Sequence, residues 1–180
     1  MKKLLFTLLL AGSVFVNSGC DVIESFETLP INIPISLPVN ISGGDDNLSE
    51  TQSFCLENFP DFNQYQDDIE DVNFVELAFR TKSFSPSNLR GNISFELMDA
   101  SGNLIFMDEL NGVSPAEFEE NPYVLQLSDE EINLMNEYLD SDENGTCFTG
   151  RVNLQITEGS GNNSLTGIID IVFEAETKIE

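Results

Sequence analysis

The sequence contains no histidine and no tryptophan, and only seven of its 180 residues are basic. Without histidine, the chain lacks Ser-His-Asp and Cys-His catalysis, histidine-ligated zinc and the most common general base. It also lacks a glycine-rich loop of the kind that binds phosphate groups. The commonest nucleophilic and zinc-dependent enzyme mechanisms are therefore excluded.

The scarcity of basic residues leaves a large excess of negative charge. The chain has 32 acidic residues and a formal net charge of -25. Such a surface repels phosphate backbones and anionic lipid headgroups, so we exclude nucleic-acid binding and electrostatic membrane binding. The chain is not a disordered acidic tail, because 41% of its residues are hydrophobic and 14 are phenylalanine.

The first twenty residues have the features of a targeting segment. A lysine pair precedes an apolar run over residues 4–16, which is too short to span a bilayer comfortably, and Asn-Ser-Gly-Cys follows, ending at Cys20. This segment resembles the lipobox of bacterial lipoprotein precursors, in which a small residue, here Gly19, precedes the acylated cysteine. One position departs from that pattern: Asn17 stands where the family favours leucine.

The resemblance implies cleavage before Cys20 and attachment of diacylglycerol and palmitate-type acyl chains there. We therefore expect a signal peptide at 1–19, the lipidated cysteine and a short tether at 20–28, and one domain at 29–180. The implied location is the bacterial cell envelope, lipid-anchored, with the outer membrane or the cell surface favoured. Ordinary secretion is the alternative.

The two other cysteines form an even pair. If Cys20 carries lipid, Cys55 and Cys147 remain, and an oxidising compartment favours a disulfide between them. The bridge would close a loop of roughly 90 residues and stabilise the fold by about 4 kcal/mol. Two separate buried thiols are the alternative, and two cysteines are too few for a cysteine-rich zinc site.

Residues 29–42, LPINIPISLPVNIS, have leucine, isoleucine or valine at every odd position. Alternation with a period of two predicts a β-strand with one apolar face. Pro30, Pro34 and Pro38 share the other face and one backbone edge, where they remove hydrogen-bond donors. The pattern predicts an edge strand that can pair on one side only, whereas a polyproline spacer is the alternative.

The rest of the chain predicts an all-β fold: an antiparallel two-sheet sandwich, Ig-like or of Greek-key type, with two or three short inserted helices. Alternating patterns predict further strands near 75–79, 93–97, 104–107, 123–127, 148–156 and 169–175. Helices are expected at 61–71, 114–117 and 128–139, the last two with capping boxes. A turn-rich loop is expected at 43–50.

One acidic motif has the ligand types that calcium prefers. Asp140, Asp142 and Asn144 alternate before a glycine, as in the first half of an EF-hand loop. Arg151 stands where the bidentate glutamate of that loop should be, so the match covers half of the motif. A non-EF calcium site is one interpretation, and a helix end followed by an Asx-Gly turn needs the same residues.

Acid pairs at 67–71 and 117–120 could be proposed as glycosidase carboxylates, but chance adjacency among 32 acids accounts for them equally well. The rare basic residues form a second candidate, a ligand patch for a carboxylate-bearing glycan or protein. Isolated salt bridges are the alternative for them. The residues of this candidate patch are Arg80, Lys82, Arg90 and Arg151.

These observations favour a membrane-anchored envelope lipoprotein that is a non-catalytic binding or structural module, not an enzyme. We expect no cofactor, with Ca²⁺ the one candidate, and a membrane contact through the lipid. The protein or glycan partner and the oligomeric state stay open. The alternatives are a carboxylate-based glycan hydrolase and a calcium-dependent adhesion module.

Overall fold

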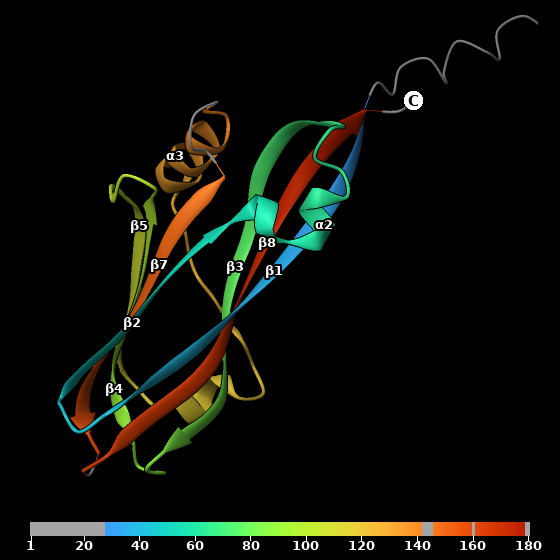
Figure 1. Cartoon of the computed structure of the whole chain (residues 1–180). Coiled ribbons are helices and arrows are strands. Elements are labelled where there is room, and N and C mark those ends of the chain that lie inside the picture. The colour runs from blue at the N-terminus through green and yellow to red at the C-terminus, as the bar shows by residue number, and fades with distance from the viewer. Residues whose placement is uncertain (1–27, 142–145, 160, 179–180) are drawn as a thin grey trace, which may run out of the picture.

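A computed structural model describes residues 28–141, 146–159 and 161–178. Eight antiparallel strands form two four-stranded sheets that pack face to face (Figure 1). The strands are β1 (Thr28–Gly43), β2 (Asn47–Cys55), β3 (Ile69–Ser85), β4 (Arg90–Asp99), β5 (Leu104–Val113), β6 (Tyr123–Val124), β7 (Cys147–Glu158) and β8 (Asn163–Lys178).

The strand order identifies the type of sandwich. The first sheet has the order β1-β8-β3-β6 and the second has the order β2-β7-β4-β5. When the two orders are compared position by position, β1 corresponds to β2, β8 to β7, β3 to β4 and β6 to β5. This is the arrangement of a jelly roll built from two Greek keys. The predicted antiparallel two-sheet sandwich is confirmed, and the strand order refines it to this eight-stranded form.

β1 is the edge strand that the sequence predicts. It pairs with β8 along its whole length, from Thr28 opposite Lys178 to Gly43 opposite Asn163. From Ile33 onward the odd-numbered apolar side chains are buried, and Ile33 and Ile35 are each 1% exposed. The prolines project no donor from the free edge, and the Asn40 amide on that same edge donates to the Glu50 carboxylate.

Four short helical segments connect the strands: η1 (Leu56–Asn58), α2 (Pro60–Asn63), η2 (Pro115–Phe118) and α3 (Asp129–Leu139). The capping boxes predicted for the last two are present, with Ser114 paired to Glu117 and Ser128 paired to Glu131. The helix expected at 61–71 is much shorter. Pro60 starts it one residue after the extended Phe59, and by Ile69 the chain is already in β3.

Two other expectations were wrong in detail. The loop expected at 43–50 ends early, since β2 begins at Asn47 and buries Leu48. Val75 was expected to face inward with Leu77 and Phe79, but it is 52% exposed. A bulge between Phe74 and Glu76 shifts the register against β8, so Phe74 takes the inward position.

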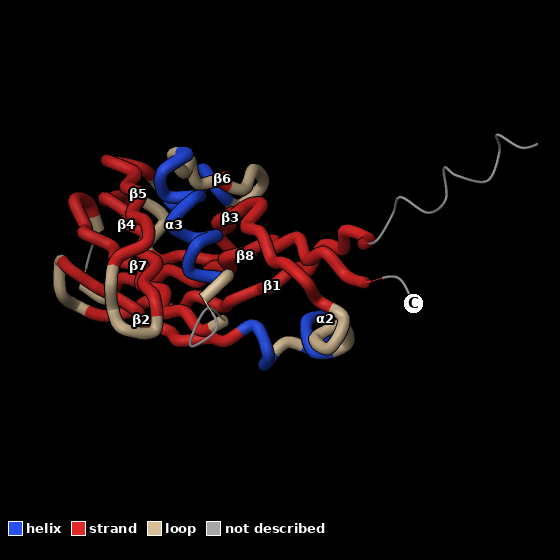
Figure 2. The backbone as a smooth tube through the Cα atoms, turned by 90° about the horizontal axis from the view of Figure 1, so that it is seen from above, coloured by secondary structure: helices blue, strands red, loops and turns tan. Residues whose placement is uncertain are grey.

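Helical segments close the two ends of the space between the sheets. At one end α3 lies between β5 and β3 (Figure 2). Its Met135 is fully buried, and its Asn136 side chain accepts from the Phe74 amide. At the other end Phe118 of η2 packs against Phe79 and Tyr123. Among the described residues, no helix has the length and apolar character needed to cross a membrane.

Candidate functional site

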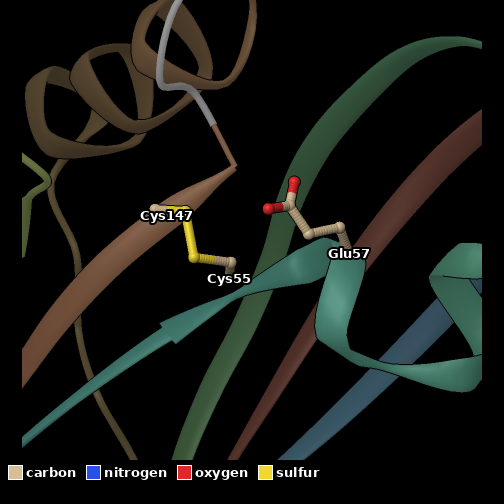
Figure 3. A group of neighbouring side chains, drawn as sticks. All are labelled: Cys55, Glu57 and Cys147. Carbon is tan, nitrogen blue, oxygen red and sulfur yellow. A yellow bond between two sulfur atoms is a disulfide. The ribbon is translucent and has the colours of Figure 1, made fainter.

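The two cysteines outside the targeting segment form the predicted disulfide. Cys55, the last residue of β2, lies opposite Cys147, the first residue of β7, and their sulfur atoms are 2.06 Å apart. The Glu57 carboxylate lies nearby, so the three side chains bring potential metal ligands within 4.8 Å of one another (Figure 3). Because the sulfurs are bonded to each other, no thiolate is available as a ligand. The cluster is a covalent link between neighbouring strands.

The calcium candidates fall only partly within the described residues. Asp140 is the C-cap of α3, whereas Asp142 and Asn144 lie outside the described residues. Partial desolvation, then a hydrogen bond and the charge of Asp71, raise the pKa of Asp140. Asp71 also accepts from the Val72 amide and from Asn73. Two neighbouring carboxylates do not make a site by themselves, and calcium binding stays a prediction.

The four basic residues do not form one patch. Arg80 lies 3.6 Å from Asp170 on the outer face of the first sheet, and Arg151 lies 3.0 Å from Glu96 on the second sheet. Lys82 sits at a bulge of β3, between Thr81 and Ser83. The expected single ligand patch is thus corrected: Arg80 and Arg151 belong to separate ion pairs, on sheets whose outer faces point in opposite directions.

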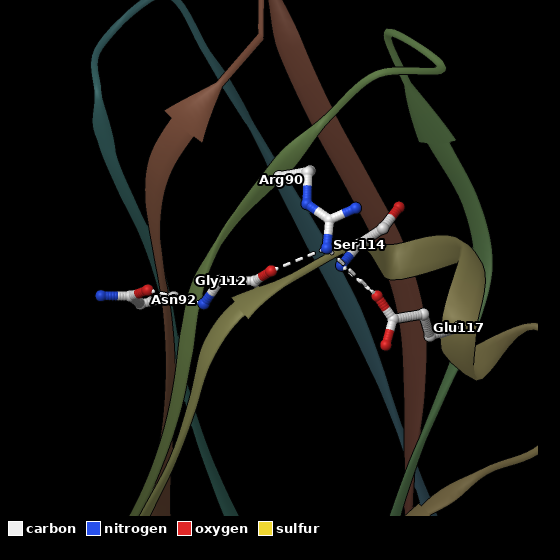
Figure 4. A network of polar contacts seen from close by, with 5 residues as sticks. All are labelled: Arg90, Asn92, Gly112, Ser114 and Glu117. Carbon is white, nitrogen blue, oxygen red and sulfur yellow. Dashed lines mark hydrogen bonds and ion pairs between the residues drawn. The ribbon is translucent and has the colours of Figure 1, made fainter.

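Arg90 has a structural environment at the start of β4. Its guanidinium donates to the Gly112 carbonyl at 2.9 Å and lies 3.7 Å from the Glu117 carboxylate (Figure 4). Glu117 in turn accepts from the Ser114 amide, and the Gly112 amide donates to Asn92. These contacts connect the end of β5 to η2 and explain why an arginine and a glutamate stand here.

On the outer face of the second sheet, the part formed by β2, β7 and β4 is polar, whereas β5 adds the exposed Leu104 and Met107. Register places the outward side chains of β2, β7 and β4 in rows across the sheet. Three rows are entirely polar, and a fourth runs from Ser53 through Thr149 to Met98. We call this surface the polar face; its polar members are Asn47, Ser49, Thr51, Ser53, Asn92, Ser94, Glu96, Thr149, Arg151, Asn153 and Gln155.

Hydrogen bonds across the strands hold the polar face in place. Asn153 donates to Ser94 at 3.0 Å and to Glu96 at 3.1 Å. Glu96 also accepts from Arg151, so its carboxylate is shared by two neighbours. Outer bonds join Ser53 to Thr149 at 3.0 Å and Asn92 to Gln155 at 3.1 Å. Such cross-strand contacts fix the side chains before any ligand arrives.

The charge of the polar face differs from that of the whole chain. Of its eleven polar side chains, Arg151 and Glu96 are the charged ones, and they neutralise each other. The formal charge of these eleven residues is therefore zero, on a chain of net charge -25, and Glu109 of β5 lies beside Ser94 at their border. A shallow depression of about 230 Å³ lies at one corner, between Asn47 and Ser49 of β2 and Asn153 and Gln155 of β7.

Aromatic side chains do not supply a stacking platform on this face. Tyr123 packs against Phe118 at the end of the sandwich, and its hydroxyl donates to Asp108 at 2.8 Å. Burial, followed by the hydrogen bond and charge of Asp108, raises the pKa of Tyr123 to about 12. Phe84 packs against the core. Ligand contacts on the polar face would therefore be hydrogen bonds.

Sequence reasoning did not find the polar face, although it named Arg151. Serine, threonine and asparagine occur in any loop, and the loop expected at 43–50 covers the first four of the nine residues of β2. The signal was the alternation of small polar residues with Leu48 and Phe54 through β2, and with Phe148, Val152 and Leu154 through β7. Only the strand register reveals that these positions form rows.

No family model matches the chain, and no curated protein matches it. Solved structures with a similar arrangement include a 60-mer BFDV capsid protein, at 9% identity and a TM-score of 0.42, covering 86% of this chain and 97% of that one. Desmodium yellow mottle tymovirus is similar at 11% identity and a TM-score of 0.39, covering 83% and 90%. Mud crab tombus-like virus is similar at 12% and 0.39, covering 86% and 84%.

Proposed function

We propose that this protein is a non-catalytic binding module, lipid-anchored at Cys20 to a bacterial envelope membrane, that presents its polar face to a neutral glycan. The observation that carries the proposal is the zero formal charge of an ordered, eleven-residue polar face on a chain of net charge -25. All but one of the 32 acidic residues lie outside the polar face. A neutral face is therefore a surface that a ligand can approach without strong electrostatic repulsion.

The chemistry of the polar face favours a glycan over a protein partner. Its hydroxyl and amide groups both donate and accept hydrogen bonds, which matches the hydroxyl groups of a sugar. Protein interfaces obtain most of their affinity from buried aromatic and arginine anchors, and here Arg151 is engaged with Glu96. Without an aromatic platform we expect weak binding, strengthened where several anchored copies act together.

The position of β1 is consistent with a short tether. β1 begins at Thr28, eight residues after Cys20. Eight extended residues span at most about 28 Å, so a lipid at Cys20 would keep the sandwich close to its membrane. The same end of the first sheet carries Lys178, which pairs with Thr28.

Two observations favour binding over hydrolysis. Asp71, in the first acid-rich stretch, shares a hydrogen bond with Asp140, so its carboxyl group is engaged outside that stretch. Glu117, in the second acid-rich stretch, is engaged by the Ser114 amide and by Arg90. Both stretches that suggested acid pairs therefore have structural contacts of their own.

The anchor is tested by metabolic labelling with palmitate in a bacterial host. The full chain should become labelled and should partition into detergent, whereas the Cys20→Ser variant should stay unlabelled. Mass spectrometry of the purified product should find acylated Cys20 as the first residue. Label that persists in Cys20→Ser, or a product that retains Met1, would contradict the anchor.

The binding face is tested by affinity electrophoresis of the purified chain through gels that contain neutral envelope or storage polysaccharides. Asn153→Ala should abolish the retardation, because Asn153 lies at the centre of the polar face and contacts two of its members. Ser36→Ala, on the outer face of the first sheet, is the matched control and should migrate as the parent does. Equal retardation of both variants would refute the assignment.

A further inference from the structure

β2 has a free backbone edge that differs from every other edge of the sandwich. It is the outermost strand of the second sheet, beside β7 (Figure 2). The Leu56 amide donates to the Thr146 carbonyl and the Ile156 amide to the Asp46 carbonyl. Even-numbered residues therefore bond to β7, and the amides and carbonyls of Ser49, Thr51 and Ser53 point outward.

Each of the other three edges has at least one feature that limits pairing with another strand. Proline occupies three positions of the free edge of β1, and Glu50 binds the Asn40 amide there. The Glu131 side chain accepts from the Met107 amide of β5, and β6 has two residues. β2 contains neither proline nor lysine, and no described residue outside the sheet bonds to the outward amides of 49, 51 and 53. An edge of this kind is a template for another strand.

We propose that β2 pairs antiparallel with β2 of a second copy of this chain, so that the second sheets of the two protomers form one continuous eight-stranded sheet. The pairing is isologous, with a two-fold axis at Thr51. It is independent of the glycan-binding proposal, because it uses the backbone edge of β2, whereas the polar face uses outward side chains.

Cross-strand complementarity selects this register and this occupant. With Thr51 opposite Thr51 of the partner subunit, Ser49 faces Ser53, Glu50 faces Gln52 and Leu48 faces Phe54. Polar groups thus meet polar groups, apolar groups meet apolar groups, and no like charges are opposed. A shift of the axis to Glu50 would oppose two carboxylates, and a shift to Gln52 would place Glu50 against Phe54.

The charge of β2 makes a second copy an acceptable partner. Glu50 is the one acid among its nine residues, and its carboxylate is turned to the Asn40 amide. β5 carries Asp108 and Glu109 side by side, so a pairing of two copies there would bring acids together. Two molecules of net charge -25 can associate only where charge is low, and β2 meets that condition.

Cysteine cross-linking tests the register in the full chain purified in detergent. Residues directly opposite in a hydrogen-bonded pair have Cα atoms about 5.5 Å apart, within the range of a disulfide. Thr51→Cys should therefore give a disulfide-linked dimer under mild oxidation. In Ser49→Cys the two introduced thiols would lie roughly 13 Å apart, so the dimer should be at least about tenfold less abundant. The parent chain, which shares every native cysteine, sets the background.

Native mass spectrometry supplies the second measurement. The parent should be a dimer, and Thr51→Pro a monomer that keeps the far-UV circular dichroism of the folded parent, because the outward amide of Thr51 is not used by β7. Asn32→Pro, at the free edge of β1, is the matched control and should stay dimeric. A monomeric parent, equal cross-linking of the 49 and 51 variants, or a Thr51→Cys adduct formed only with a different protein would overturn the proposal.

Discussion

β1 and β2 form the same side of the sandwich, one in each sheet, and they are held in different ways. β1 is long, apolar on one face and blunted by proline, and it is held by burial and by its ladder with β8. β2 is shorter and mostly polar, and a disulfide fastens its end to β7. A strand with little apolar surface gains from a covalent link, whereas a strand with a full apolar face does not need one.

Removing the disulfide, which fastens β2 to β7, should have the largest effect on the free energy of unfolding. Replacement of Cys55 and Cys147 by serine opens a loop with a sequence separation of 92 residues. The entropy of the unfolded chain then rises, and the free energy of unfolding should fall by about 4 kcal/mol. Denaturation of the double variant, compared with the parent under non-reducing conditions, measures the loss. A change below about 1 kcal/mol would show that β2 does not depend on the link.

A cavity created in the core beneath β1 should have the next largest effect on the free energy of unfolding. Ile35 is 1% exposed and packs in the core, so Ile35→Ala should lower the free energy of unfolding by about 3 kcal/mol. Leu29→Ala is the control, since Leu29 belongs to the same strand but is 52% exposed. If both variants lose the same stability, burial is not what holds β1. Urea denaturation of the two variants provides the comparison.

Replacement of a glycine on β7 should change the free energy of unfolding by less, and should raise it. Gly150 borders the small apolar space between β1 and β2, and an added Cβ would meet nothing nearer than the Gln52 carbonyl oxygen, at 3.9 Å. Gly150→Ala should therefore raise the free energy of unfolding by about 0.5 kcal/mol.

Gly91→Ala on β4 is the matched contrast to that variant. There the Cβ would lie 2.3 Å from the Gln155 carbonyl oxygen, so the backbone must move and the variant should be destabilised. Thermal denaturation of the two alanine variants should give shifts of opposite sign. Shifts of the same sign would mean that the space beside Gly150 is not available to a side chain.

The smallest effect on stability should come from the contact between Asp140 and Asp71, which involves neither β1 nor β2. It therefore serves as a reference for the larger effects in those two strands. The pKa of Asp140 is raised above 3.8, so its ionisation is less favourable in the folded state than in the unfolded state. Stability is therefore lost as pH rises through the interval between the unfolded and folded pKa values. Asp140→Asn should melt slightly above the parent at pH 7, with the difference vanishing in acid below the ordinary pKa. Added CaCl₂ should raise the parent's melting temperature alone if Asp140 also binds calcium.

The parts of the fold that follow from sequence are those with strong local signals. The alternation in 29–42, the capping box at Ser128 and the paired cysteines each point to one structure, and each prediction was confirmed. β2 was partly missed because its outward residues are small and polar, which is equally typical of a loop. The orientation of Val75 depends on a bulge, which is set by pairing with β8 and leaves no local signal.

The candidate site was predictable only in its parts. Arg151 drew attention because basic residues are rare, but its partner Glu96 lies on β4 and is brought to it by register. The expectation of one basic patch failed because charge composition carries no information about which sheet a residue occupies. A face assembled from three strands becomes visible only after their order is known.

The pairing of Thr28 with Lys178 has a consequence for how the chain is made. β1 is synthesised before all other described strands, yet its one neighbour in the sheet, β8, is synthesised after them. The first sheet cannot close until β8 has emerged, and in that interval β1 is an apolar strand without a partner. Pro30, Pro34 and Pro38 therefore act before the native state exists as well as in it, because they leave the unpaired strand one edge, instead of two, on which a neighbouring nascent chain could pair.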